Sequence, residues 1–285
     1  MKIILSRPAG FCAGVQRAYD LIKNNYARTQ KPVYILGRLV HNTHIIRRLK
    51  KWGIKTISNP YGIKKGTVII PSHGFDPKIT ALLKSKKIKI INTTCPKVSQ
   101  VMAKARLLKK QSKTILIFGD KSHPEVKAIN QAVNNQGLVF SNIKELQTFL
   151  NTKIAKNQRL SLISQTTQNI DHLKRIKEIL SAKTPGVQVF NTICPATHIR
   201  QNQAKKLAKK ADVMLVIGSP ISANSNRLFQ ICKKNNSRAF FVDKAAQIKK
   251  QWFNAKDVVG ISTGASTPQN IIKQIIKKLK TCKSS

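Results

Sequence analysis

Acidic residues are scarce in this sequence: 10 Asp+Glu stand against 53 Lys+Arg in 285 residues, which gives a formal net charge of +43. Such a charge favours binding to nucleic-acid phosphates. However, aromatic residues for base stacking reach only 6%, the lysines are spread over the whole chain, and no nucleic-acid-binding motif is present. Hydrophobic residues make up 41%, too many for a disordered polycation. We therefore expect a folded protein and keep nucleic-acid binding only as the weaker alternative.

Long hydrophobic runs are also absent. The apolar stretches, such as 213–217, fall far short of the roughly 18 residues that span a bilayer. The first residues carry no secretory pattern, so we expect a cytoplasmic protein with reduced thiols and no membrane partner. Five cysteines at wide spacing argue against a disulfide framework, and without a C-x-x-C pair a structural zinc site is not indicated. Neither a Walker motif nor G-x-G-x-x-G occurs, so no nucleotide site is predicted.

Three of the cysteines head similar segments. A short apolar run ending in Gly follows 24 or 25 residues after each cysteine, and a polar cluster follows after 28 or 29. Helical spacing of apolar residues predicts helices from residues 97 and 199, between cysteine and run. A second apolar run, at 68–73, 160–166 and 258–266, ends each segment on hydroxyl or His residues. The cysteine, glycine and polar positions are, in order, Cys12, Gly37 and His41; Cys95, Gly119 and His123; and Cys194, Gly218 and Ser222.

This spacing predicts an α/β protein built from three similar units, each a small parallel sheet with crossover helices. We place the units at residues 1–94, 95–193 and 194–285. Because ligands collect at the carboxyl ends of parallel strands, the three cysteines and the polar clusters are expected to converge on one cleft.

The chemistry of three cysteines leaves several readings open. Three thiolates could hold zinc, although zinc usually takes a fourth protein ligand. They could instead hold an iron–sulfur cluster, in which one iron would stay open to substrate. Taken singly, each Cys-Pro could merely mark a turn with a buried thiol. The repeat favours a ligand role for the set, whereas Cys232 and Cys282 lie outside it and are expected to be structural.

The remaining polar residues of the expected cleft are mostly neutral or cationic donors, which suit a phosphate or diphosphate. Glu125 is the exception. A single carboxylate among donors could act as a proton relay, yet a Glu after Pro124 could equally begin a helix. The candidate residues are His41, His73, His123, Glu125, Thr166, Ser222, Asn224 and Ser266.

The motifs, taken in order, resemble the 4-hydroxy-3-methylbut-2-enyl diphosphate reductases, which end the methylerythritol phosphate route to isoprenoids. The resemblance covers nearly the whole chain. The motifs are Gly10-Phe11-Cys12-Ala13-Gly14-Val15, Val40-His41-Asn42, Ser72-His73-Gly74, Thr94-Cys95-Pro96, His123-Pro124-Glu125-Val126, Gln165-Thr166-Thr167, Cys194 with Ala196-Thr197 and Arg200-Gln201, Asn224-Ser225-Asn226-Arg227, and Gly264-Ala265-Ser266.

This resemblance implies a pseudo-threefold cloverleaf of three α/β domains around a 4Fe-4S cluster with one open iron, held by Cys12, Cys95 and Cys194. It implies two-electron removal of the substrate hydroxyl as water, giving isopentenyl and dimethylallyl diphosphate, with flavodoxin or ferredoxin as electron donor. Catalytic roles fall to Glu125, Thr166 and His123, with Glu125 the proton source. Substrate contacts fall to His41, His73, His123, Thr166, Ser222, Ala223, Asn224 and Ser266.

The chain departs from the family pattern in a few places. Ala223 stands where the family usually has a second Ser, so one anion contact must come from the backbone or be lost. Ala128 replaces a common Gly and Asn92 a common Asp. None of these changes removes a cysteine or Glu125. A cluster-dependent dehydratase, which needs no reductant, stays as a third reading.

Overall fold

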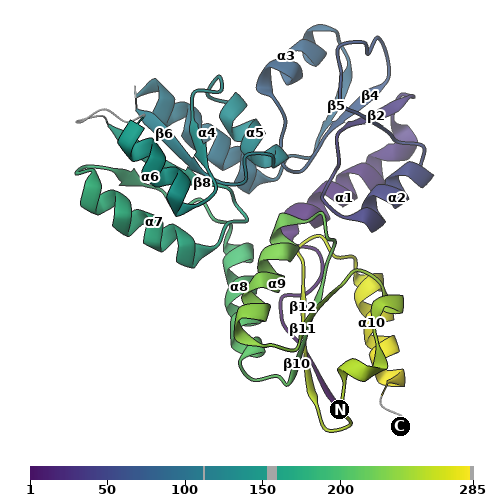
Figure 1. Ribbon diagram of the computed structural model, residues 1–285. Coiled ribbons are helices and arrows are strands. Elements are labelled where there is room, and N and C mark those ends of the chain that lie inside the picture. Colours follow the sequence, from purple (N-terminus) through teal and green to yellow (C-terminus); the bar gives the residue numbers. More distant parts are fainter. Residues whose placement is uncertain (112, 153–158, 283–285) are drawn as a thin grey trace. The chain divides into compact units, whose positions relative to one another are not determined.

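The computed structural model describes residues 1–111, 113–152 and 159–282 (Figure 1). Contacts divide the chain into two compact bodies. We call Met1–Gln16, Val40–Trp52 and Pro195–Ser285 the terminal body, and Arg17–Leu39 with Gly53–Cys194 the middle body. None of the helices formed by the described residues is both long and apolar enough to cross a membrane.

Three four-stranded parallel sheets form the framework, and this confirms the predicted α/β class. The terminal sheet has the order β1-β12-β10-β11, and the two sheets of the middle body have the orders β3-β2-β4-β5 and β7-β6-β8-β9. The strands are β1 (Lys2–Leu5), β2 (Val33–Leu36), β3 (Lys55–Ile57), β4 (Thr67–Ile70), β5 (Lys89–Asn92), β6 (Thr114–Phe118), β7 (Leu138–Phe140), β8 (Leu160–Ser164), β9 (Gln188–Val189), β10 (Val213–Ile217), β11 (Ala239–Val242) and β12 (Val258–Thr263).

The three sheets share one topology. In the middle body, β2 and β6 each pair with the next strand on one side and the third strand on the other, and the fourth strand joins the third. The terminal sheet repeats this pattern with β10, β11 and β12, except that its fourth strand is β1. Central strands such as β10 are buried along their whole length, as expected for parallel strands covered on both faces.

The position of β1 corrects one feature of the predicted units. The spacing predicts the first unit at residues 1–94, but residues 2–5 pair in parallel with Val258–Ile261 and so complete the terminal sheet. The apolar run Ile3–Leu5 forms a strand whether it belongs to the first unit or to the terminal sheet. Only its partner strand shows to which sheet it belongs. The boundaries at 94/95 and 193/194 stay a prediction.

Helices connect and cover the strands, and short 3₁₀ turns lie between some of them. The helices are α1 (Ala13–Asn25), α2 (Thr43–Lys51), α3 (Pro77–Ser85), α4 (Pro96–Lys110), α5 (Pro124–Gln131), α6 (Ile143–Thr152), α7 (Ile170–Lys183), α8 (Pro195–Ala208), α9 (Ala223–Asn235) and α10 (Gln269–Thr281), with 3₁₀ turns η1 (Tyr26–Arg28), η2 (Ala245–Gln247) and η3 (Lys250–Trp252).

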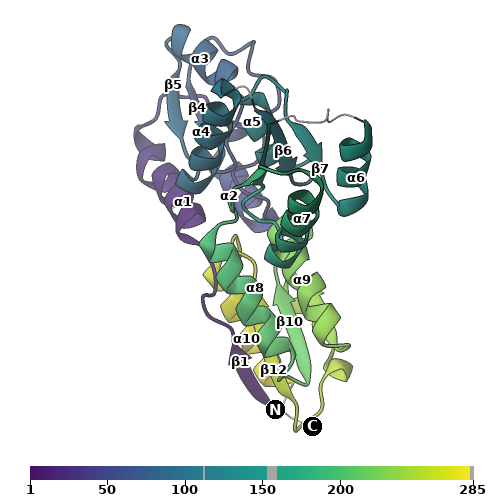
Figure 2. The same cartoon turned by 90° about the vertical axis from the view of Figure 1, so that its left-hand side faces the viewer.

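Packing of the helices follows their apolar positions. Helix α4 buries Val98, Val101, Met102, Ala105 and Leu108, the spacing that predicted it, against β6 and β8. In the terminal body, α8 and α9 bury Ala204 and Leu228 on one face of the sheet. Helix α10 packs Ile271, Ile272, Ile275 and Leu279 on the other face (Figures 1 and 2). Burying one such side chain contributes roughly 1.5–3 kcal/mol, so both layers stabilise the sheet.

Candidate active site

The three repeat cysteines are held by the same backbone contact. Each cysteine N–H donates to the carbonyl that lies two residues past the end of the neighbouring strand. The contacts are Cys12 N to Ala265 O after β12 (2.9 Å), Cys95 N to Ser72 O after β4 (2.8 Å), and Cys194 N to Thr166 O after β8 (2.9 Å). The threefold repeat read from the spacing therefore has a geometric counterpart at the carboxyl ends of the strands.

Each of these cysteines also directly precedes a helix, namely α1, α4 or α8. A helix N-terminus favours negative charge, as a thiolate ligand requires. All three are half-buried free cysteines. Cys232 differs because it is fully buried, and burial raises the pKa of its thiol to about 12. The three repeat cysteines therefore differ in burial from Cys232, which is an apolar thiol of the core, and their role as cluster ligands stays a prediction.

In the middle body, Glu125 and Thr166 form a close pair. Glu125 is 3% exposed. Its Oε1 accepts from the Thr166 backbone N–H (2.6 Å), and its Oε2 accepts from the Thr166 hydroxyl (2.9 Å). Because Thr166 O also accepts from Cys194 N, one residue joins the acid to a cysteine.

His123 places Glu125 in the first turn of α5. The His123 side chain caps this helix, and its Nδ1 accepts from the Glu125 N–H (3.2 Å). Glu125 therefore lies in the first turn of a helix, as one interpretation predicted, and its buried carboxylate accepts from Thr166, while its role as a proton relay stays a prediction. The His123 ring lies 6.4 Å from that of His73, centroid to centroid.

These contacts connect the predicted residues of the middle body into one series. His73 follows Ser72, whose carbonyl binds Cys95 N, and it meets the ring of His123. The series runs Cys95, Ser72, His73, His123, Glu125, Thr166 and Cys194. Acid, hydroxyl, imidazoles and two cysteines thus lie along the carboxyl ends of β4, β6 and β8.

The terminal body gathers the remaining predicted residues around the start of α9. Ser222 caps this helix, its hydroxyl accepting from the Ser225 N–H (3.3 Å). Asn224, in the first turn, is 5% exposed, and neither its Oδ1 nor its Nδ2 has a hydrogen-bond partner. His41 lies against this loop, with Nδ1 3.2 Å from Ile221 O.

Ser266 belongs to the same end of the terminal sheet. It lies after β12, next to Ala265, and its buried hydroxyl also has no hydrogen-bond partner. A buried polar atom without a partner costs about 1–3 kcal/mol. Asn224 and Ser266 are therefore suited to bind a polar ligand, and the first-turn N–H groups of α9 suit an anion. Ala223 contributes only its backbone there.

The predicted site residues fall into two groups, one in each body. Cys12, His41, Ser222, Ala223, Asn224 and Ser266 belong to the terminal body, and Cys95, Cys194, His73, His123, Glu125 and Thr166 to the middle body. Within the described ranges, no group of three His, Cys, Asp or Glu side chains could hold a metal ion. The joint ligand set of Cys12, Cys95 and Cys194 stays a prediction.

Sequence reasoning missed the role of Asn42. It caps α2, and its Oδ1 accepts from His44 N (3.0 Å) and Ile45 N (3.3 Å), which fixes the backbone next to His41. An Asn before the apolar pattern Ile45, Ile46 and Leu49 is a helix-start signal that could have revealed it.

The fold and the two groups define an α/β enzyme that carries acid, hydroxyl, imidazole and thiol groups at the carboxyl ends of parallel strands. A sequence model of the family described as LytB protein matches residues 3–280. The chain belongs to this family. A curated relative from Syntrophotalea carbinolica, named 4-hydroxy-3-methylbut-2-enyl diphosphate reductase, is 38% identical over 280 residues, 98% of each chain.

Two solved structures agree with this assignment. The E-1-hydroxy-2-methyl-but-2-enyl-4-diphosphate reductase of Plasmodium falciparum has a TM-score of 0.90 at 26% identity, covering 98% of this chain and 88% of its own. A structure of (E)-4-hydroxy-3-methyl-but-2-enyl diphosphate reductase, described as the terminal enzyme of the non-mevalonate pathway, has a TM-score of 0.70 at 35% identity, covering 99% and 100%. The predicted family and the oxidoreductase class are confirmed.

Proposed function

We propose that this chain reduces 4-hydroxy-3-methylbut-2-enyl diphosphate. Two electrons and two protons remove the substrate hydroxyl as one water and leave isopentenyl or dimethylallyl diphosphate. The observation that carries the proposal is the attachment of Glu125 and Cys194 to one residue, Thr166. Thr166 thus binds both a carboxyl group that can carry a proton and the backbone of a proposed cluster ligand, and a reductive dehydroxylation needs a proton source and an electron source close together.

The ligands of the cofactor are proposed to be Cys12, Cys95 and Cys194, holding a 4Fe-4S cluster with one open iron. Their shared backbone contact and their place before three helices support this assignment. When bound, such a cluster supplies electrons and a Lewis-acidic iron for the leaving oxygen.

The diphosphate is proposed to bind through His41, His73, Ser222, Asn224 and Ser266, with His123 close to it and the Ala223 backbone N–H in the remaining place. The buried polar atoms of Asn224 and Ser266 support this role. Imidazoles, hydroxyls and helix N–H groups all donate to phosphate oxygens.

The proton path is proposed to run from Glu125 through Thr166. A proton on Glu125 Oε2 can pass to Thr166 Oγ1, 2.9 Å away, while the Thr166 hydroxyl gives its own proton to the substrate oxygen. The Thr166 N–H, bonded to Oε1, holds the carboxyl group in this orientation during the transfer.

The electron donor is proposed to be a flavodoxin or a ferredoxin. Both classes are small acidic carriers, and the net charge of +43 would draw such a partner at low salt. A donor is required because the reaction consumes two electrons, which distinguishes it from a dehydratase.

The test is anaerobic reconstitution of the full chain with iron and sulfide, followed by assay with the diphosphate substrate and a chemical reductant. We expect a brown protein that forms both products only when the reductant is present. A colourless, iron-free protein, or turnover without reductant, would refute the proposal.

A substitution tests the role of Glu125 within the same assay. Glu125→Gln keeps the size of the side chain but removes the transferable proton, so turnover should fall by roughly a hundredfold or more while iron content and substrate binding persist. Glu178→Gln, at an exposed position of α7, is the matched control. Unchanged turnover in Glu125→Gln would contradict the proton role.

A further inference from the structure

In two of the three chain segments that lead into the cysteines, a threonine hydroxyl binds the backbone of the neighbouring strand. Thr93 and Thr192 each lie two residues before a cysteine. The Thr93 hydroxyl donates to Ile70 O (2.5 Å), and the Thr192 hydroxyl donates to Ser164 O (2.6 Å). Ile70 and Ser164 are the last residues of β4 and β8. One hydroxyl therefore fixes each segment to the end of the neighbouring strand.

The segment that leads into Cys12 has no such hydroxyl, because the residue two positions before the cysteine is Gly10. Its φ of +77° favours glycine, and a Cβ there would lie 2.9 Å from Gln269 Oε1. The corresponding strand, β12, ends at Thr263. The Thr263 carbonyl accepts instead from Nη1 of Arg200, 3.2 Å away.

Arg200 reaches this segment from α8 and is 3% exposed. Its Nη1 donates to Pro8 O (2.8 Å) and its Nη2 to Gly10 O (2.8 Å). The N–H groups of the same segment bind the end of β12. These contacts are Ser6 N to Ile261 O (2.8 Å), Gly10 N to Thr263 Oγ1 (2.9 Å) and Cys12 N to Ala265 O (2.9 Å). The donors of the segment thus bind β12, and two of its carbonyls bind Arg200.

We propose that Arg200 is the positioning residue of Cys12, doing from α8 what Thr93 and Thr192 do within their own segments. A single hydroxyl can bind one carbonyl, whereas the guanidinium group of Arg200 binds three. The segment before Cys12 needs these contacts because it is longer than the other two and has no side chain at Gly10. That Cys12 is a cluster ligand rests on the proposed function; the fixing of the segment does not.

The first experiment measures amide hydrogen exchange of the cluster-free protein. Arg200→Met keeps the length of the stem and removes the fork, so residues 6–12 should exchange roughly tenfold faster or more, since hydrogen bonds from charged donors are lost. Residues 92–95 and 191–194 should keep their rates. Arg200→Lys should restore part of the protection, and Arg175→Met, at an exposed position of α7, should change nothing.

The outcomes separate positioning from general stability. If amide exchange in Arg200→Met is accelerated equally at all three cysteine segments, or is not accelerated at residues 6–12, the proposal is overturned. If Arg200→Met does not fold, Arg200→Lys decides between the same two outcomes.

A second measurement follows iron rather than turnover. After anaerobic reconstitution, Arg200→Met should lose iron to a chelator several times faster than wild type, with Arg200→Lys between them, and equal rates would count against the role at Cys12. If the wild-type chain holds no iron, the proposed function fails, while the exchange rates still decide whether Arg200 fixes the segment.

Discussion

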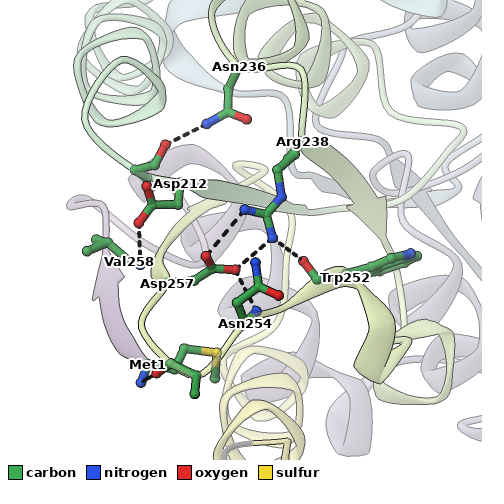
Figure 3. A network of polar contacts seen from close by, with 10 residues as sticks. Met1, Asp212, Asn236, Arg238, Trp252, Asn254, Asp257 and Val258 are labelled. Carbon is green, nitrogen blue, oxygen red and sulfur yellow. Dashed lines mark hydrogen bonds and ion pairs between the residues drawn. The ribbon is translucent and has the colours of Figure 1, made fainter.

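Asp257 binds the amino ends of three strands in the terminal sheet, and Figure 3 shows the contacts of its carboxylate with Arg238 and Asn254. Its backbone carbonyl accepts from Lys2 N at the start of β1 (2.9 Å). Its carboxylate accepts from Arg238, which precedes β11, through Nη2 (2.7 Å) and Nη1 (3.3 Å), and from Asn254 N (2.8 Å). Asp257 itself precedes β12, so this carboxylate joins β11 to β12.

Asp257→Asn tests how much this carboxylate contributes. In the wild type the Asp257 carboxylate accepts three hydrogen bonds, two of them from Arg238. The single oxygen of the Asn amide can accept only some of these three bonds. Losing two bonds of about 1.5 kcal/mol each predicts a loss of about 3 kcal/mol. The Arg238 side chain is 39% exposed and can be rehydrated, so the roughly 3–5 kcal/mol typical of a broken buried pair marks the upper limit.

The pH dependence follows from the pKa of Asp257. Hydrogen bonding to Arg238, followed by the Asn254 backbone N–H, lowers the pKa of this carboxyl, against the opposing effect of burial. The folded state therefore binds the proton less readily than the unfolded state. This stabilisation is complete above the unfolded pKa, about 3.9, and is lost as the pH falls through the folded pKa. The difference between wild type and Asp257→Asn should be constant from neutral pH to about 5 and narrow below about 4.

The assay is native-state hydrogen exchange at β11 and β12, which measures the terminal sheet without requiring the two bodies to unfold together. A loss of about 3 kcal/mol corresponds to roughly a hundredfold faster exchange. Asp171→Asn, at an exposed acid of α7, is the control. A double-mutant cycle with Arg238→Met should show coupling between the two residues. Unchanged exchange in β12, or a difference that stays the same at every pH, would refute the reasoning.

Two further predictions concern the proposed ligands. Cys95→Ser should lower the iron bound after reconstitution, whereas Cys232→Ser should leave it unchanged because that buried thiol, with its pKa raised to about 12, stays protonated; equal losses in both would contradict the ligand assignment. Ala223→Ser adds a hydroxyl at the first residue of α9 and should lower KM for the diphosphate severalfold with little effect on kcat. An unchanged KM in steady-state assays would show that the Ala223 backbone already makes the full contact.

Sequence reasoning could locate the repeated elements because their signals are local. Apolar runs that end at Gly37, Gly119 and Gly218 are strands, and the residues predicted for the buried face of α4 are buried. The sheet to which β1 belongs could not be predicted in this way. Its apolar residues fit a strand anywhere, and its partner lies more than 250 residues away in the chain.

The residues of the candidate site also differ in whether local sequence signals could predict their contacts. Glu125 and Thr166 follow strands β6 and β8, which are neighbours in one sheet, so the strand-end rule was enough to bring them together. Arg200 fits no such rule. It is an interior residue of α8, and its acceptors are backbone carbonyls of a segment about 190 residues earlier, which carry no sequence signal. A contact between a side chain and a backbone carbonyl far away in the sequence can be found only in the three-dimensional structure.

The scarcity of acids can be understood from what the existing acids bind. In the part of the chain that the structure describes, at least five of the ten carboxylates accept a hydrogen bond from a backbone N–H: Asp76 from Lys78, Glu125 from Thr166, Glu145 from Ser141, Asp212 from Val258 and Asp257 from Asn254. Lysine offers three donors and no acceptor, so it cannot replace a carboxylate at these places. An exposed acid on a helix face carries no such requirement, and a surface can become basic there without loss of the fold. A net charge of +43 is therefore compatible with this architecture and needs no nucleic-acid partner to explain it.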